Sequence, residues 1–535
     1  MLALLREFLF QKTKHGLLIV VAALSGVLLV KSATYSAETI KFNYGLLGFK
    51  VETADLELFA EEGIITDRLN FYLKRLSLEQ RKRFQSFLQQ TYDVNPVLVY
   101  RFSHTSVGIK MLKRLGNIVN IPEDINGFYG IRAAIINSAA SPEGVNFINF
   151  LNQFPTDIKL DLDEVFDLVE KISQTERNTE KFIASLEQNN KTINNKNNIE
   201  VNSEFEESGT FKPVKETINF YDRGRDRQIT TDFYFPAKLT KKVPLIVVSN
   251  GLGAERKRFA ELANYLTSHG FAVAVPEHPG SNQQRQQEFI KGLHQENFDG
   301  TDFMDRPLDI SFMLDELTKI DRERFNNFID PNNVGIFGYS IGGTTALSLA
   351  GANIDYKQLA EDCKQTLDLT NISVLYQCRA LEIRSREKSL QDKRIKSAFL
   401  FVPFGKSLFN TATLDKVKIP MLWQVVDKDF LTSLTKEQLP LYSLLQNSDR
   451  TLVIAENLPH STATLSKQRS ATQQNESRIA RKYQNILALV FFKTYLTREE
   501  YGKYLNDNFV KAITEAPYTL HLTKEVPSIN EIESN

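Results

Sequence analysis

The chain has 535 residues but only two cysteines, no excess of charge of either sign, and no common phosphate- or zinc-binding signature. Lysine plus arginine and aspartate plus glutamate number 65 each, so no net field draws the whole protein to nucleic acid. The sequence contains neither a Walker-type glycine-rich loop nor the Cys/His spacing of a zinc site, which argues against these two kinds of site. The length exceeds what one hydrophobic core usually serves, so we expect two or three domains.

The N-terminus joins a basic segment to an uncharged apolar run. Lys12 and Lys14 precede Gly16–Val30, in which no charged residue occurs. This order predicts a secretory signal peptide, and the run is shorter than the roughly 20 residues of a comfortable membrane span. Lys31 follows at once and no clean A-x-A site precedes Ala37, so an uncleaved membrane anchor is the alternative. We therefore expect residues 1–37 to direct export, and the protein to be periplasmic or secreted.

The cysteines agree with export. Cys363 and Cys378 lie close together in the sequence, and a disulfide would persist outside the cytoplasm. We favour a disulfide between them over the alternative of two buried thiols.

The first half of the chain predicts a helical domain and a linker. Over residues 38–173, Ser77 with Gln80 forms a capping box, and Ser141 before Pro142 predicts another helix start. Residues 174–212 are rich in Asn, Lys and Glu and poor in large apolar side chains, which predicts a flexible linker at the domain boundary. A helical start over Glu176–Leu186 is an open alternative for its first part.

The second half predicts the α/β class. Over residues 213–500, short apolar strands alternate with amphipathic helices, as expected of a mainly parallel sheet that helices cover on both faces. Residues 501–535 remain as a polar C-terminal tail. An insertion at residues 355–392, which contains both cysteines, is a candidate lid.

The segment Phe337–Gly343, "FGYSIGG", raises the question of whether Ser340 is a catalytic nucleophile. A G-x-S-x-G pentapeptide also occurs by chance, so its context decides. Here a buried strand, "NVGIFGY", runs directly into a helix, "IGGTTALSLAG", and a sharp turn at this point exposes the hydroxyl of Ser340. The N–H of Ile341, at the helix start, is then a candidate oxyanion donor.

A serine nucleophile needs a histidine base and a carboxylate, in the chain order Ser, Asp/Glu, His. Of the two histidines that follow Ser340, His460 stands on a loop after a predicted strand, whereas His521 lies in the tail. For the acid, the loop after "IPMLWQVV" offers Asp427 and Asp429. We favour Asp429, which fits the usual spacing of the class, and keep Asp427 and Glu456 as alternatives.

The second oxyanion donor is expected on the loop after the first buried strand, "VVSNGLG". Gly251 would let the backbone approach the site, and the N–H of Leu252 is the candidate donor. An ordinary glycine turn is the alternative.

Several of these segments resemble one family. "VVSNGLGAERKRFAELANYLTSHGFAVAVPEHPGSN", "RPLDISFMLDEL", "GIFGYSIGG" and "ENLPHST" resemble platelet-activating-factor acetylhydrolases and dienelactone hydrolase-like esterases over about residues 215–495. The N-terminal block looks like the domain of unknown function that precedes such hydrolases in cyanobacteria. The resemblance implies the α/β-hydrolase fold, with Ser340, Asp429 and His460 as the triad and Leu252 and Ile341 at the oxyanion hole.

The chain departs from this family at two places. Asn250 stands where relatives commonly have histidine, and Val426 where they have a small residue, which weakens the choice between Asp427 and Asp429. We expect structural roles for His278 and His294, and expect Arg306 and Asp309 to hold their helix to its neighbours.

The sequence thus predicts a serine hydrolase of carboxylic esters, with a lipid or a short- to medium-chain acyl ester as substrate. No metal or organic cofactor and no nucleic-acid partner is expected, and the N-terminus could associate with a membrane. The alternative is an inactive hydrolase fold that acts as a binding or scaffold protein at the membrane.

Overall fold

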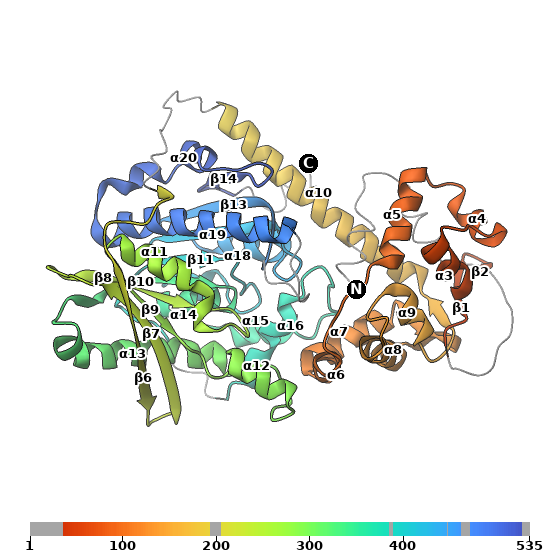
Figure 1. The fold of residues 1–535 in the computed structure, drawn as a ribbon, viewed down its shortest axis with the longest axis horizontal. Coiled ribbons are helices and arrows are strands. Elements are labelled where there is room, and N and C mark those ends of the chain that lie inside the picture. Colours follow the sequence, from red (N-terminus) through yellow and green to blue (C-terminus); the bar gives the residue numbers. More distant parts are fainter. Residues whose placement is uncertain (1–35, 193–204, 385–388, 447, 462–470, 527–535) are drawn as a thin grey trace.

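The computed structural model describes residues 36–192, 205–384, 389–446, 448–461 and 471–526 (Figure 1). The apolar run Gly16–Val30 lies outside these residues. Ala37, expected at the end of the leader, is buried in the core of the N-terminal domain. None of the helices in the described part of the chain is long and apolar enough to cross a membrane.

A nine-stranded sheet forms the centre of the second domain. Its order is β14-β13-β12-β11-β10-β8-β9-β7-β6. The strands from β13 to β9 in this order are parallel, whereas β6, β7 and β14 pair antiparallel at the two edges. The strands are β6 (Pro213–Asp222), β7 (Arg227–Pro236), β8 (Val243–Ser249), β9 (Ala272–Pro276), β10 (Ile329–Tyr339), β11 (Ile395–Phe401), β12 (Met421–Lys428), β13 (Arg450–Pro459) and β14 (Leu520–Thr523).

Both faces of this sheet are covered, as the apolar strands predict. Along β8, Leu245 and Val247 pack with helices α13 (Asp302–Arg324) and α14 (Ile341–Ala350). Ile246 and Val248 point to the opposite face, toward α11 (Ala260–Ser268) and α19 (Ala471–Phe492). The predicted α/β-hydrolase fold is confirmed in this domain. Its remaining helices are α12 (Gln283–Ile290), α15 (Tyr356–Asp362), α16 (Ser373–Gln377), α17 (Thr411–Leu414), α18 (Leu439–Leu444) and α20 (Asp507–Ala512).

The N-terminal domain is mostly helical but also contains a five-stranded sheet that the sequence did not predict, in the order β2-β1-β5-β3-β4. Its strands are β1 (Thr39–Tyr44), β2 (Leu47–Glu52), β3 (Val119–Ile121), β4 (Ile125–Asn126) and β5 (Ile158–Leu160). Its helices are α3 (Thr53–Glu62), α4 (Asp67–Leu73), α5 (Leu78–Gln89), α6 (Pro96–Ser103), α7 (Ser106–Gly116), α8 (Phe128–Ala140) and α9 (Phe147–Asn152).

The two predicted helix starts in this domain have different outcomes. The capping box of Ser77 and Gln80 is confirmed at the start of α5. The start at Ser141 is wrong, because Ser141 ends α8 and the next helix begins after Asn146, whose side chain accepts from the N–H of Asn149.

Helix α10 (Leu162–Thr192) differs from the predicted flexible linker, since it continues through residues 174–192 and connects the domains (Figure 1). Leu162 and Leu168 are buried in the N-terminal core. Phe182 and Leu186, one helical turn apart, are buried in the core of the hydrolase domain. The polar composition of this segment therefore belongs to the exposed faces of a long helix.

The predicted C-terminal tail is folded onto the hydrolase domain up to residue 526, where the described residues end. Strand β14 pairs with β13, and His521 at its centre is 1% exposed and bonds to Glu456. Without β14, strand β13 would be an edge strand with unpaired backbone groups, and β14 pairs with these groups.

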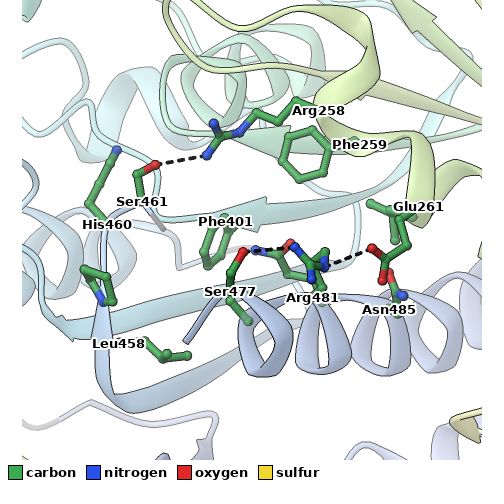
Figure 2. A pocket seen from close by; sticks show the side chains of 14 residues that line it. Arg258, Phe259, Glu261, Phe401, Leu458, His460, Ser461, Ser477, Arg481 and Asn485 are labelled. Atoms are coloured by element: carbon green, nitrogen blue, oxygen red, sulfur yellow. Dashed lines mark hydrogen bonds and ion pairs between the residues drawn. The ribbon is translucent and has the colours of Figure 1, made fainter. Parts of the chain in front are cut away.

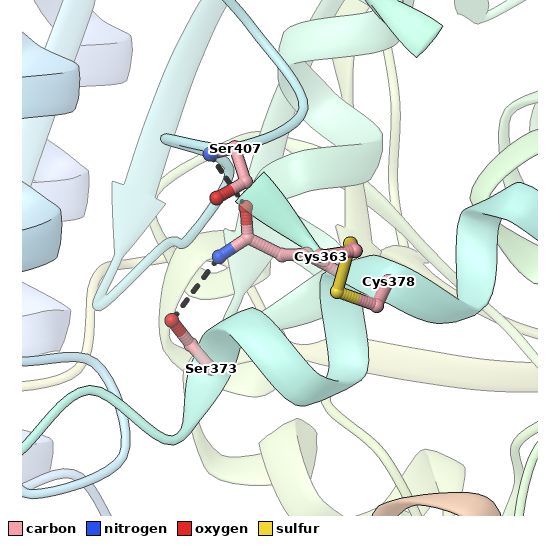
Figure 3. The surroundings of a disulfide bond; sticks show 5 residues. Cys363, Ser373, Cys378 and Ser407 are labelled. Carbon is pink, nitrogen blue, oxygen red and sulfur yellow. Dashed lines mark hydrogen bonds between the residues drawn. A yellow bond between two sulfur atoms is a disulfide. The ribbon is translucent and has the colours of Figure 1, made fainter. Parts of the chain in front are cut away.

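The described part of the insertion, residues 355–384 and 389–392, packs between the domains. A disulfide joins Cys363 to Cys378 (Figure 3). Gln377 next to it donates to Ser373 Oγ at 3.1 Å and accepts from the N–H of Ser407 at 2.9 Å. Leu369, from the same insertion, is buried in the N-terminal core.

Candidate active site

Ser340 occupies the turn between strand β10 and helix α14. Its φ of 55° and ψ of −120° lie outside the regions that a non-glycine residue normally adopts. The N–H of Ser340 donates to the carbonyl of Phe401 at 2.9 Å, which ties the turn to strand β11. A strained serine at the end of a buried strand matches the predicted nucleophile elbow.

Two positions around Ser340 require glycine, because backbone carbonyl oxygens lie too close to leave room for a side chain. A Cβ on Gly338 would lie 2.3 Å from the carbonyl oxygen of Gly342. A Cβ on Gly342 would lie 2.0 Å from the carbonyl oxygen of Ser249, at the end of the neighbouring strand β8. Both distances are shorter than a carbon and an oxygen can tolerate, so the turn packs this tightly only with glycine.

His460 follows strand β13 and lies against Ser340. Its Nε2 is 3.1 Å from Ser340 Oγ, and its Nδ1 is 2.7 Å from Asp429 Oδ2. With Asp429 ionised, Nδ1 carries the proton and Nε2 is left to accept from the serine hydroxyl. The three side chains are 8% exposed or less, so water is largely excluded from their hydrogen bonds. The structure therefore brings together the serine, histidine and aspartate that the sequence analysis favoured.

The carboxylate of Asp429 is fixed by the turn that follows strand β12. Its Oδ1 accepts from the backbone N–H groups of Leu431 and Thr432, at 2.9 and 2.8 Å. Its Oδ2 accepts from Thr432 Oγ1 and from Gln438 Nε2 in addition to His460. These contacts fix the carboxylate and aim one of its oxygens at the imidazole.

The alternative acids do not reach His460 by any contact among the described residues. The side chain of Asp427 is 6% exposed and its carboxylate lies 3.5 Å from Lys428, and burial raises the pKa of this carboxyl. Glu456 bonds instead to His521 on β14. The D-x-D sequence thus places one carboxylate toward the histidine and one away from it.

The loop after β8 comes close to Ser340, as predicted. A Cβ on Gly251 would lie 3.6 Å from the Cβ of Ser340 and 2.7 Å from the ring of Tyr339. Gly251 therefore allows the backbone to run beside the elbow. The N–H of Leu252 belongs to the next peptide, and that of Ile341 to the first residue of α14. Their roles as oxyanion donors stay predictions.

Three residues around the histidine were missed by the sequence analysis. Thr432 Oγ1 lies 3.3 Å from His460 Nδ1 and bonds to Asp429. The hydroxyl of Tyr339 donates to the carbonyl of His460 at 3.2 Å, and burial raises its pKa. Arg258 bonds to Ser461 Oγ at 3.0 Å and covers the ring of Tyr339. Only Thr432 had a local signal, because it stands three residues after Asp429, where a hydroxyl can turn back to a carboxylate.

Two cavities adjoin this group of residues. One, of about 220 Å³, lies beside His460 between α11 and α19, and Arg258 points into it toward Ser461 (Figure 2). The other, of about 530 Å³, lies between α10 and the turn that carries Asp429. Ser340 lines neither of them, so we assign neither to the acyl group.

Three side chains with metal-ligand chemistry lie close together elsewhere in the described part of the chain. Ligand atoms of Glu187, Glu456 and His521 come within 4.8 Å of one another. The contact between His521 and Glu456 joins β14 to β13, which gives His521 and Glu456 a structural role without an ion.

Comparison with known families gives two matches. A model described as "Alpha/beta hydrolase of unknown function (DUF1400)" matches residues 36–161, and the model of "Platelet-activating factor acetylhydrolase, isoform II" matches residues 227–300. The first match covers the N-terminal domain, and the second runs from β7 through α12, includes the loop at Gly251 and ends before α13. No curated protein matches the chain. The matches support a hydrolase-like, acetylhydrolase-related protein, and neither of them reaches Ser340, Asp429 or His460.

Proposed function

We propose that the protein is a serine esterase that hydrolyses carboxylic esters through an acyl-enzyme. The observation that carries this proposal is the continuous chain of hydrogen bonds from Ser340 Oγ to His460 and on to Asp429, built on a strained turn. The similarity to an acetylhydrolase family favours an ester over other acyl substrates.

The mechanism follows from the roles of these atoms. Ser340 Oγ attacks the ester carbonyl while His460 Nε2 takes its proton, and Asp429 stabilises the imidazolium that forms. The N–H groups of Leu252 and Ile341 hold the developing oxyanion. His460 then gives the proton to the leaving alcohol. Water, activated by the same histidine, attacks the acyl-enzyme and releases the acid and Ser340.

We further propose that the substrate is a lipid ester or an ester of a short- to medium-chain acid, and that the insertion at residues 355–392 covers the site. We also keep the proposal that the protein is exported, with residues 1–37 as signal peptide or anchor and with membrane association through the anchor. The basis is the sequence of Lys12 to Val30 alone.

The test is hydrolysis of p-nitrophenyl esters from acetate to palmitate, with labelling of Ser340 by a fluorophosphonate. The wild type should turn over a limited range of chain lengths, and Ser340→Ala should be neither active nor labelled. If the wild type is inert and Ser340 resists the label, the esterase proposal fails and the binding-protein alternative takes its place.

A matched pair of variants tests the acid. Asp429→Asn should lower kcat by about 10⁴-fold, because the neutral amide no longer stabilises the imidazolium or selects its tautomer. Asp427→Asn, two residues away and without contact to His460, should keep kcat within a few-fold. Equal losses in the two variants would contradict the assignment of Asp429.

A further inference from the structure

A buried arginine lies directly behind the loop that approaches Ser340. Arg306, on helix α13, is 1% exposed. One terminal nitrogen, Nη1, donates to the carbonyl of Asn250, and the other, Nη2, lies 3.5 Å from the carbonyl of Gly251. We propose that Arg306 is a positioning residue that sets the orientation of the oxyanion loop, an inference that rests on the proposed esterase function.

The geometry of a peptide unit connects this contact to the reaction. The carbonyl of Gly251 and the N–H of Leu252 belong to one planar trans peptide, in which the two groups point in opposite directions. When Arg306 holds the carbonyl on one side, the N–H is directed to the other side. A Cβ on Gly251 would lie 3.6 Å from the Cβ of Ser340, so the loop lies beside the nucleophile. Rotation of this peptide would remove the donor from the oxyanion.

The loop is held at its other end as well. The N–H of Gly253 donates to the carbonyl of Ser281 at 2.8 Å. Ser249, just before the loop, has its Oγ 3.0 Å from His278 Nε2. The peptide that carries the Leu252 N–H is therefore fixed from both sides, and Arg306 supplies the contacts in the middle.

Arg306 is itself fixed by two buried oxygen groups. Its Nε and Nη2 donate to Ser281 Oγ at 2.9 and 2.6 Å, and Nε lies 3.4 Å from Asp302 Oδ2. Ser281 in turn donates to Asp302, which is fully buried. A Cβ on Gly280 would lie 2.1 Å from the carboxylate of Asp302, so the chain packs tightly around this group.

The number of bonds explains why arginine is needed here. One planar guanidinium reaches the carbonyls of Asn250 and Gly251 and the hydroxyl of Ser281 at once. Lysine keeps the charge but concentrates its donors on one nitrogen, which cannot occupy the same fork. The exchange Arg306→Lys therefore tests positioning while it leaves a positive charge in the site.

The experiment compares Arg306→Lys with the matched control Arg227→Lys. Arg227 forks onto Asp309 of the same helix, at 3.0 and 2.8 Å, and its described contacts do not include the loop. It also lies 3.7 Å from Asp302 Oδ1, whereas Arg306 and Ser281 contact the other oxygen, Oδ2. Arg306→Lys should lower kcat by about 10²-fold, the size of the loss of one oxyanion donor, with little change in KM. Fluorophosphonate labelling of Ser340 should slow in the same proportion, and Arg227→Lys should keep both rates within a few-fold.

A second variant covers the case in which Arg306→Lys does not fold. Ser281→Ala removes the hydroxyl that accepts two of the guanidinium bonds, and it should lower kcat in the same direction with a normal melting temperature. If the wild type is active and a folded Arg306→Lys or Ser281→Ala variant keeps full kcat, the inference about Arg306 is overturned and the proposed function stands. Equal losses in Arg306→Lys and Arg227→Lys would also overturn it, because they would indicate a general effect of the buried charges. An inert wild type would instead overturn the proposed function.

Discussion

His278 is a histidine that burial keeps uncharged, and it lies next to the loop that approaches Ser340. It is 3% exposed, with Nε2 at 3.0 Å from Ser249 Oγ and Nδ1 at 3.8 Å from Asp309. Burial first, and then the nearby charge of Arg306, lower its pKa to about 4. The sequence predicted a structural role for this residue, but the pairing with Ser249 depends on two strands that only the fold brings together.

This shift predicts a loss of stability in mild acid. Between pH 6.5 and about 4 the unfolded chain binds a proton at His278 that the folded protein does not, so stability falls as the pH falls, by at most about 1.4 kcal/mol per pH unit. Asp302, whose pKa burial raises to about 6, contributes with the opposite sign in the same range. The measurement is therefore the difference in urea unfolding between the wild type and His278→Gln at each pH. This difference should shrink from pH 7 to pH 4, and a constant difference would contradict the prediction.

At the same scale, the sequence was informative about residues whose roles depend on chain order. Ser340, Asp429 and His460 follow the order and spacing of one reaction type, and the structure places them in contact. Arg306 carries no such signal, because its contacts with Asn250 and Gly251 join residues more than 50 positions away in the chain.

At the scale of elements, the turn between β10 and α14 and the end of β8 form one packed unit. Gly342→Ala would place a methyl group 2.0 Å from the carbonyl oxygen of Ser249. We expect this overpacking to cost about 1–3 kcal/mol of stability and to lower esterase activity, since it moves both Ser340 and the loop that follows Ser249. Urea unfolding and p-nitrophenyl ester turnover measure the two effects.

Gly48→Ala on β2 is the matched control, because the nearest heavy atom to the added methyl group is 3.6 Å away. It should leave both stability and activity close to those of the wild type. If Gly342→Ala behaves in the same way, the turn is less tightly packed than the structure indicates.

The sequence predicts those strands and helices whose residue pattern is complete within a short segment. The buried strands of the large sheet are five to eleven apolar-rich residues long and stand out in the sequence. The N-terminal strands β3, β4 and β5 have two or three residues each, and β1 pairs with β5 across more than 100 residues. Strands this short contain no alternating pattern of apolar and polar residues from which they could be predicted. Their pairing is decided by the tertiary fold. Strand β14 was missed for the same reason.

At the scale of the whole molecule, helix α10 is shared by two cores. With 31 residues it spans about 46 Å, long enough to begin in the N-terminal domain and end on the hydrolase domain. The sequence could not predict this, because the second contact is made by two large apolar side chains, Phe182 and Leu186, within a segment of mostly polar composition.

We expect Phe182→Ala to weaken the hydrolase domain and its attachment to α10, at a cost of roughly 3–5 kcal/mol for a fully buried phenylalanine. Differential scanning calorimetry should show a transition at lower temperature in this variant. Lys181→Ala, the exposed neighbour, should stay within about 0.5 kcal/mol of the wild type. Identical thermograms for the two variants would rule out a stabilising role for this contact.

The shared helix also limits how the chain can be divided into separately expressed domains. A fragment that starts at Pro213 would lack Phe182 and Leu186 and would expose to water the apolar surface that they cover. The complementary fragment, ending in the Asn-rich stretch, would carry the same two side chains without a partner. Expression of either half alone therefore calls for redesign of this surface, because the boundary that composition predicts at residues 174–212 begins inside a helix that contacts both cores.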